Sequence, residues 1–278
     1  MSADRLSARR KLFRRVAIGL ILLAAPLLLW LEFGKPSLSS DPNLSNIISM
    51  TLTRLVGAAV FFALILSEGY RLLSPVRGLR PVGAFLAAFV LPLAVVINNF
   101  PLPALIAGEA EILPASPTLW AWFLLECLAI ALFEEAAFRG FFLPALAERC
   151  GRTKRGLLLS ILLSSAVFGL VHLVNLAGGA GIGGVLRQIG YSFLVGAMCA
   201  VVLIKTHNLW LCVILHATFD VGGKLIETVG EGRIWTTPAI VITATLAVLT
   251  TAYLTVLFFR PDPRPFEEVY PKNPTPAE

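Results

Sequence analysis

The stretch LLECLAIALFEEAAFR, residues 124–139, places two adjacent glutamates, Glu134 and Glu135, in an otherwise apolar segment. A charge at the centre of a bilayer costs roughly 2.5–3.5 kcal/mol on insertion scales. Two neighbouring carboxylates also repel each other. A membrane segment therefore keeps such a pair only when the pair is neutralised, hydrated in a cavity, or used in the function of the protein.

The composition of the whole chain is typical of an integral membrane protein. Of its 278 residues, 57% are hydrophobic and 14% are charged, whereas about 25% of the residues in soluble domains are charged. The apolar segments are long and continuous rather than alternating, which favours membrane helices over a closed β-barrel. The sequence thus predicts an all-α, polytopic membrane protein with about eight transmembrane helices.

Eight apolar segments are long enough to be predicted as membrane spans. They cover roughly residues 16–33, 47–66, 80–97, 118–147, 156–176, 184–204, 208–229 and 237–259. A basic N-terminus (1–15) precedes the multi-span domain (16–260), and a proline-rich tail (261–278) that we predict to be disordered follows it. The first segment is predicted to be an uncleaved span, because its apolar run is longer than that of a signal peptide.

Basic residues gather on one side of these predicted spans. Most of the 23 Lys and Arg residues lie in the N-terminus, in the 67–80 and 148–155 loops, at Lys205 and in the tail. Cytoplasmic loops carry such an excess, so both termini are predicted to be cytoplasmic in a protein of the plasma membrane. The net charge of +6 is explained by this orientation, which predicts a lipid bilayer and no nucleic acid as partner.

Helical spacing gives the two glutamates different neighbours. Glu135 and Arg139 are four residues apart, so they share a helix face and can form an ion pair. Glu134 lies about 100° further round the helix and has no such partner in its own segment. Glu134 is therefore the better candidate for a general base. The alternative is that both glutamates bind basic residues of other helices and only hold the helices together.

Other predicted spans also carry polar side chains. Arg54 lies within the second, and the fifth contains FGLVH, residues 168–172. The seventh contains HATFD, in which His216 and Asp220 are four residues apart and share a helix face. A lone histidine in a helix is more often structural than catalytic. With a rise of 1.5 Å per residue, however, Glu134, His172 and His216 can meet in one cavity between the midplane and the cytoplasm.

Together, three motifs on three predicted spans resemble the CPBP (Abi) family of intramembrane endopeptidases, which includes the Ras-converting CAAX endoprotease. The motifs are Glu134-Glu135-x-x-x-Arg139, Phe168-x-x-x-His172 and His216-x-x-x-Asp220, within roughly residues 118–229. The resemblance implies an eight-helix fold with a cavity open toward the cytoplasm. It also implies a membrane-associated peptide or protein as substrate, processed in the manner of a CAAX tail or of a bacteriocin precursor.

The resemblance further implies a role for each matching residue. Glu134 and His172 would activate the hydrolytic water, and His216 and Asp220 would stabilise the oxyanion. The supporting residues are Glu135, Arg139 and Phe168. Two other functions remain open at this point, a non-catalytic immunity or scaffold protein of the same fold and a proton-coupled carrier.

Asp220 departs from the family pattern, which often has Asn at this position. An ionised Asp only accepts hydrogen bonds and would repel an oxyanion. Asp220 is therefore protonated, plays another role, or binds a cation. Lys224 lies four residues further on, so a simple Asp220–Lys224 ion pair is the structural alternative.

The resemblance favours a mechanism without a cofactor, and zinc is the alternative. Zinc would be held by Glu134, His172, His216 and Asp220, with one position left open for water. The sequence contains no HExxH motif. Cys127, Cys199 and Cys212 fall in apolar runs and are predicted to be small buried hydrophobic residues rather than zinc ligands.

Overall fold

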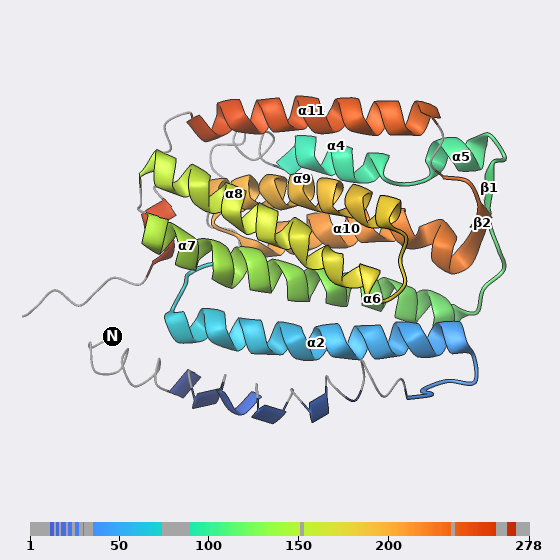
Figure 1. The fold of residues 1–278 in the computed structure, drawn as a ribbon, viewed down its shortest axis with the longest axis horizontal. Coiled ribbons are helices and arrows are strands. Elements are labelled where there is room, and N and C mark those ends of the chain that lie inside the picture. The colour runs from blue at the N-terminus through green and yellow to red at the C-terminus, as the bar shows by residue number, and fades with distance from the viewer. Residues whose placement is uncertain are drawn as a thin grey trace, which may run out of the picture.

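The computed structural model describes residues 36–73, 89–150, 153–234, 237–259 and 266–270, together with scattered residues between 12 and 30. This part of the chain is almost entirely helical, as the composition predicts. The long helices run along the longest dimension of the molecule (Figure 1). Backbone groups in a bilayer must be satisfied within the segment itself, and a helix achieves this.

The helices and short strands follow one another along the chain with these bounds. They are α2 (Pro42–Glu68), α4 (Leu91–Asn98), α5 (Leu102–Ile106), β1 (Ala110–Ile112), α6 (Pro117–Glu135), the π-helix η2 (Ala136–Phe142), α7 (Leu143–Cys150), α8 (Lys154–Leu170), the 3-10 helix η3 (Val171–Leu176), α9 (Ile182–Thr206), α10 (Leu209–Val229), β2 (Gly230–Gly232), α11 (Thr237–Phe259) and the 3-10 helix η4 (Phe266–Val269).

Polar side chains cap the helices that carry the predicted motifs. Ser116 accepts a hydrogen bond from Leu119 N at 3.1 Å at the start of α6. Thr153 caps α8, and Asn208 accepts from Trp210 N at 2.9 Å at the start of α10. Such caps satisfy amide groups that have no partner within the helix. They fix where each of these three helices begins.

Five of the described helical segments are long and apolar enough to cross a membrane. They are Pro42–Glu68, Lys154–Leu176, Ile182–Thr206, Leu209–Val229 and Ala239–Phe259, and they match the spans predicted at 47–66, 156–176, 184–204, 208–229 and 237–259. The chain is therefore a polytopic integral membrane protein. α6 is not among the five, and it carries three glutamates in 19 residues.

Other predicted segments fall partly or wholly outside the described residues. Much of the span at 16–33 and half of the span at 80–97 lie there, so the predicted total of eight spans stays a prediction. Most of the predicted N-terminus and tail lie there too. Within the tail, Phe266 and Tyr270 are buried, and the backbone carbonyl of Val269 accepts a hydrogen bond from Arg71 N at 2.9 Å.

The segment predicted as one helix over 118–147 is divided in the structure. α6 ends at Glu135, a π-helical turn follows over Ala136–Phe142, and α7 continues to Cys150. A π-helix displaces backbone carbonyls from their usual partners. Ser164 of α8 donates a hydrogen bond to the carbonyl of Phe138 at 3.2 Å, and so compensates one of them. The turn begins directly after the glutamate pair.

A two-stranded antiparallel ladder is the one departure from helix in the described residues. β1 pairs with β2, with Ala110 opposite Gly232 and Ile112 opposite Gly230. The ladder lies at one end of the bundle (Figure 1). Gly232 has φ +115°, and a Cβ there would lie 2.3 Å from Glu109 O, so glycine is required. The ladder ties the end of α10 to the segment before α6.

α9 and α10 occupy the middle of the bundle (Figure 1). The second half of α9, from Met198 to Ile204, is buried throughout. α2 and α6 lie on one side of these central helices, and α4 and α11 lie on the other side (Figure 1). α10 also packs against α6, and α8 against α9. α8 also contacts η2, so the α6–η2 segment packs against both of the other helices that carry motifs.

Candidate active site

His216 of α10 connects the two glutamates of α6. Its Nδ1 lies 2.7 Å from Glu135 Oε1, and its Nε2 lies 3.6 Å from Glu134 Oε2. The ring is 5% exposed. A carboxylate bonded to one ring nitrogen fixes the orientation of the ring and leaves the other nitrogen for chemistry. The two glutamates therefore meet one imidazole, one on each side.

The predicted ion pair between Glu135 and Arg139 is confirmed. Arg139 Nη1 lies 3.0 Å from Glu135 Oε1, and both side chains are fully buried. The guanidinium carbon of Arg139 also lies 4.2 Å from the centroid of the Phe168 ring, in cation–π contact. Gly196 of α9 leaves room for this arginine, since a Cβ there would come 2.7 Å from Nη2. Glu135 thus has two partners, Arg139 and His216, where the sequence predicts only the first.

Phe168 places His172 beside this group. Its ring centroid lies 5.6 Å from that of His172 and 5.9 Å from that of His216. His172 Nε2 is buried and has no hydrogen-bond partner among the described residues. A buried polar atom without a partner in a native protein is a candidate for contact with substrate or water.

Asp220 faces the same histidine. Its Oδ2 lies 3.7 Å from His216 Nε2 and has no hydrogen-bond partner in the described part of the chain. The alternative of an Asp220–Lys224 pair is wrong for this structure. Lys224 Nζ instead lies 2.7 Å from Glu126 Oε1 of α6. The long lysine side chain reaches the neighbouring helix, and Asp220 keeps its free oxygen beside His216.

The predicted residues therefore form a single buried cluster. Glu134, Glu135 and Arg139 come from α6 and η2, Phe168 and His172 from α8 and η3, and His216 and Asp220 from α10. A carboxylate beside an imidazole, as Glu134 is beside His216, can accept a proton from water. An imidazole held by one carboxylate can donate to developing negative charge when it carries both protons. The cluster thus contains the groups needed for hydrolysis by an activated water.

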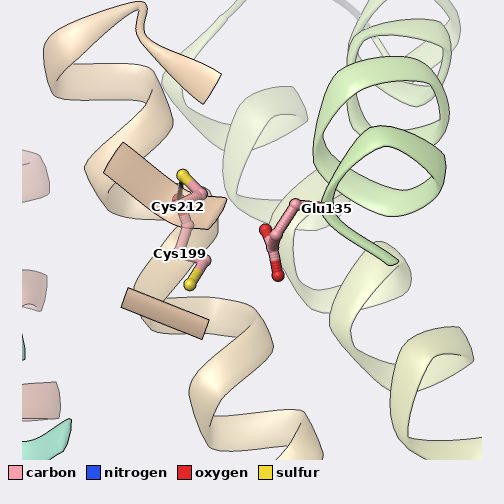
Figure 2. A group of neighbouring side chains, drawn as sticks. All are labelled: Glu135, Cys199 and Cys212. Carbon is pink, nitrogen blue, oxygen red and sulfur yellow. Dashed lines mark hydrogen bonds between the residues drawn. The ribbon is translucent and has the colours of Figure 1, made fainter. Parts of the chain in front are cut away.

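Glu135 also belongs, with the buried Cys199 and Cys212, to the one group in the described residues whose possible metal-binding atoms all lie within 4.8 Å of one another. Figure 2 shows the Glu135 carboxylate beside the two cysteines of α9 and α10. Cys212 Sγ donates to the carbonyl of Cys199 at 3.2 Å. Both thiols are buried, as predicted for small hydrophobic residues. The zinc alternative for Glu134, His172, His216 and Asp220 stays a prediction.

One charged side chain near the cluster, Arg54, belongs to none of the three motifs. Its guanidinium carbon lies 5.4 Å from the centroid of the ring of Phe133, the residue that precedes Glu134 in α6. A basic residue in the middle of an apolar span was the signal, because such residues usually serve a function. No motif connected it to the other three segments.

Comparison with known protein families agrees with this geometry. Residues 116–222 match a model described as type II CAAX prenyl endopeptidase Rce1-like. The searches of curated proteins and of solved structures found no match. The matched range contains the whole buried cluster, and the cluster is consistent with the catalytic residues of that family. Residues 116–222 of this chain are therefore an Rce1-like type II CAAX prenyl endopeptidase domain of the CPBP (Abi) family.

Proposed function

We propose that the protein is an intramembrane endopeptidase. It hydrolyses a peptide bond in a membrane-associated peptide or protein, with a water activated by Glu134 and His172. The observation that carries this proposal is the bridge made by His216, which joins Glu135 through Nδ1 and faces Glu134 and Asp220 through Nε2. This bridge lies inside the matched peptidase domain.

The reaction begins with removal of a proton from water by Glu134 while His172 holds that water. The oxygen of the water bonds to the carbonyl carbon, and the carbonyl becomes an oxyanion. A doubly protonated His216 donates from Nδ1 to Glu135 and from Nε2 to the oxyanion, which places a fixed donor where negative charge develops. Asp220, whose Oδ2 lies 3.7 Å from Nε2, donates a second hydrogen bond to the oxyanion when it is protonated. The C–N bond then breaks, and Glu134 passes its proton to the leaving amine.

The substrate class is inferred from the family domain that residues 116–222 match. A CAAX-type tail or a bacteriocin-type precursor meets the site at the membrane, and the partners are such a peptide and the bilayer. The distribution of basic residues supports an orientation with both termini in the cytoplasm. The site at Glu134 would then open toward the cytoplasm, in a protein of the plasma membrane.

An isotope experiment tests the proposed hydrolysis. The purified protein is incubated in detergent or liposomes with lipidated C-terminal peptides, in water enriched in oxygen-18. We expect two products, with one heavy oxygen in the new carboxyl group of the amino-terminal fragment, measured by mass spectrometry. Heat-denatured protein serves as the control. Intact peptides after prolonged incubation with folded protein would contradict the proposal.

Metal analysis tests the choice between the two mechanisms. We expect cleavage to persist after treatment with a strong zinc chelator, and the active protein to contain much less than one zinc per chain. Zinc is held at about 2.0–2.2 Å by His and carboxylate ligands, which requires a compact group. About one zinc per chain, lost together with activity, would favour the zinc mechanism. Cys199→Ser and Cys212→Ser variants then show whether that zinc sits at the group in Figure 2.

A further inference from the structure

Arg54 is a charged side chain deep in α2 that takes no part in the proposed reaction. At a rise of 1.5 Å per residue, it lies about 21 Å from the end of α2 at Glu68. By the same measure Glu134 lies about 24 Å from Cys150, where α7 ends. The two side chains are therefore at similar depths. An arginine at such depth is costly, and the default interpretation is a functional one.

Packing between α2 and α6 holds Arg54 beside the cluster. The ring of Phe133, the residue before Glu134, packs directly on α2, since a Cβ on Gly57 would come 2.6 Å from that ring. The guanidinium of Arg54 lies against the same ring, with its carbon 5.4 Å from the centroid. Arg54 therefore borders the catalytic group from the side of α2.

The carboxylates of the cluster already have other partners. Glu126 binds Lys224, and Glu135 binds Arg139 and His216. Glu134 and Asp220 both face His216.

Within the described residues no ion pair reaches Arg54. Its Nε is buried without a hydrogen-bond partner there. A guanidinium with free donors at an active site is suited to bind a carboxylate through two parallel hydrogen bonds.

We propose that Arg54 is an anion-binding subsite for a carboxylate of the peptide substrate, located on the part of the peptide that leaves. Binding there would hold the scissile bond at Glu134. The inference rests on the proposed function and specifies one chemical feature of its substrate. A free C-terminal carboxylate and an acidic side chain offer the same chemistry, so the experiment must separate them.

Matched peptides separate the two sources. One pair has the same sequence with a C-terminal acid or a C-terminal amide, and a second pair has Glu or Gln after the scissile bond. If the C-terminus binds Arg54, we expect the amide to raise KM about tenfold in the wild-type protein, as loss of a charge-assisted contact implies. Arg54→Gln should raise KM for the acid by about the same factor and leave the amide unchanged. If an acidic side chain binds Arg54 instead, the same changes in KM appear for the Glu and Gln peptides: Gln raises KM in the wild type, and Arg54→Gln raises KM for the Glu peptide alone.

Two further variants serve as controls. Arg54→Lys keeps the charge without the planar fork and should retain part of the preference for the acid. Arg187→Gln removes an exposed arginine of α9 and should leave both peptides unaffected. Gel filtration and thermal unfolding in detergent establish that each variant is folded. If Arg54→Gln does not fold, the comparison of Arg54→Lys with the wild type carries the test.

Equal effects of Arg54→Gln on all four peptides would overturn the inference and leave Arg54 as a structural counter-charge. A wild-type protein that cleaves the acid and the amide equally, and the Glu and Gln peptides equally, would overturn it as well. If the wild type cleaves none of them, the proposed function fails. Binding of the same peptides, measured by fluorescence polarisation, then tests the subsite alone: stronger binding of one carboxylate peptide, lost in Arg54→Gln, supports it, and equal binding rejects it.

Discussion

Replacing Glu134 by Gln should lower kcat for peptide cleavage by about 10²–10⁴-fold, the range for loss of a positioned general base. Gln has nearly the same shape as Glu but cannot accept a proton from water. The Glu134 side chain is 15% exposed, and its Oε2 lies 3.6 Å from His216 Nε2. The substitution therefore removes a proton acceptor and little packing. The rate is measured with purified protein at saturating peptide.

The matched control is Glu227→Gln, which changes an exposed glutamate of α10 and should leave kcat within about twofold, as surface substitutions usually do. Thermal unfolding should be similar for wild type and both variants. Cleavage by Glu134→Gln at the wild-type rate would remove Glu134 from the mechanism. Full function of Glu134→Gln and His172→Ala variants in cells would favour a non-catalytic role for the fold.

Spacing in the sequence was enough to predict an ion pair when both partners lie on the same helix. The Glu135–Arg139 pair is such a case, and it is confirmed at 3.0 Å. It persists although the backbone changes to a π-helix after Glu135. The same rule failed for Asp220 and Lys224, because Lys224 reaches Glu126 on a neighbouring helix. Helical spacing shows which contacts are possible, and packing between helices selects among them.

Contacts between residues of different helices could not be predicted from the sequence. The bond between His216 and Glu135 joins residues 81 positions apart, and only the packing of α10 on α6 produces it. The motif spacing placed these residues in one cavity but assigned Glu135 only to Arg139, its partner on the same helix, and not to His216. Arg54 was visible as a charge in an apolar span, but its position beside Phe133 depends on how α2 packs on α6.

Replacing Arg139 by Met should destabilise the protein by about 3–5 kcal/mol, the usual cost of removing one partner of a buried ion pair. Arg139 is 1% exposed and Glu135 is 0% exposed, so the remaining carboxylate cannot be hydrated without opening the bundle. The contact of the guanidinium with the Phe168 ring is lost as well. The loss is measured as a lower midpoint of unfolding in detergent. Arg155→Met, at an exposed arginine of α8, is the matched control.

A double variant separates charge from packing in this prediction. Glu135→Leu together with Arg139→Met removes both buried charges, and replacing a buried ion pair by apolar residues is often neutral or stabilising. The double variant should therefore unfold at a higher temperature than Arg139→Met alone. It should still be inactive or nearly so, because His216 loses the carboxylate 2.7 Å from its Nδ1 that fixes the ring. A double variant no more stable than the single one would show that Arg139 acts mainly through packing on Phe168 and beside Gly196. Retained activity in the double variant would show that the orientation of His216 does not depend on Glu135.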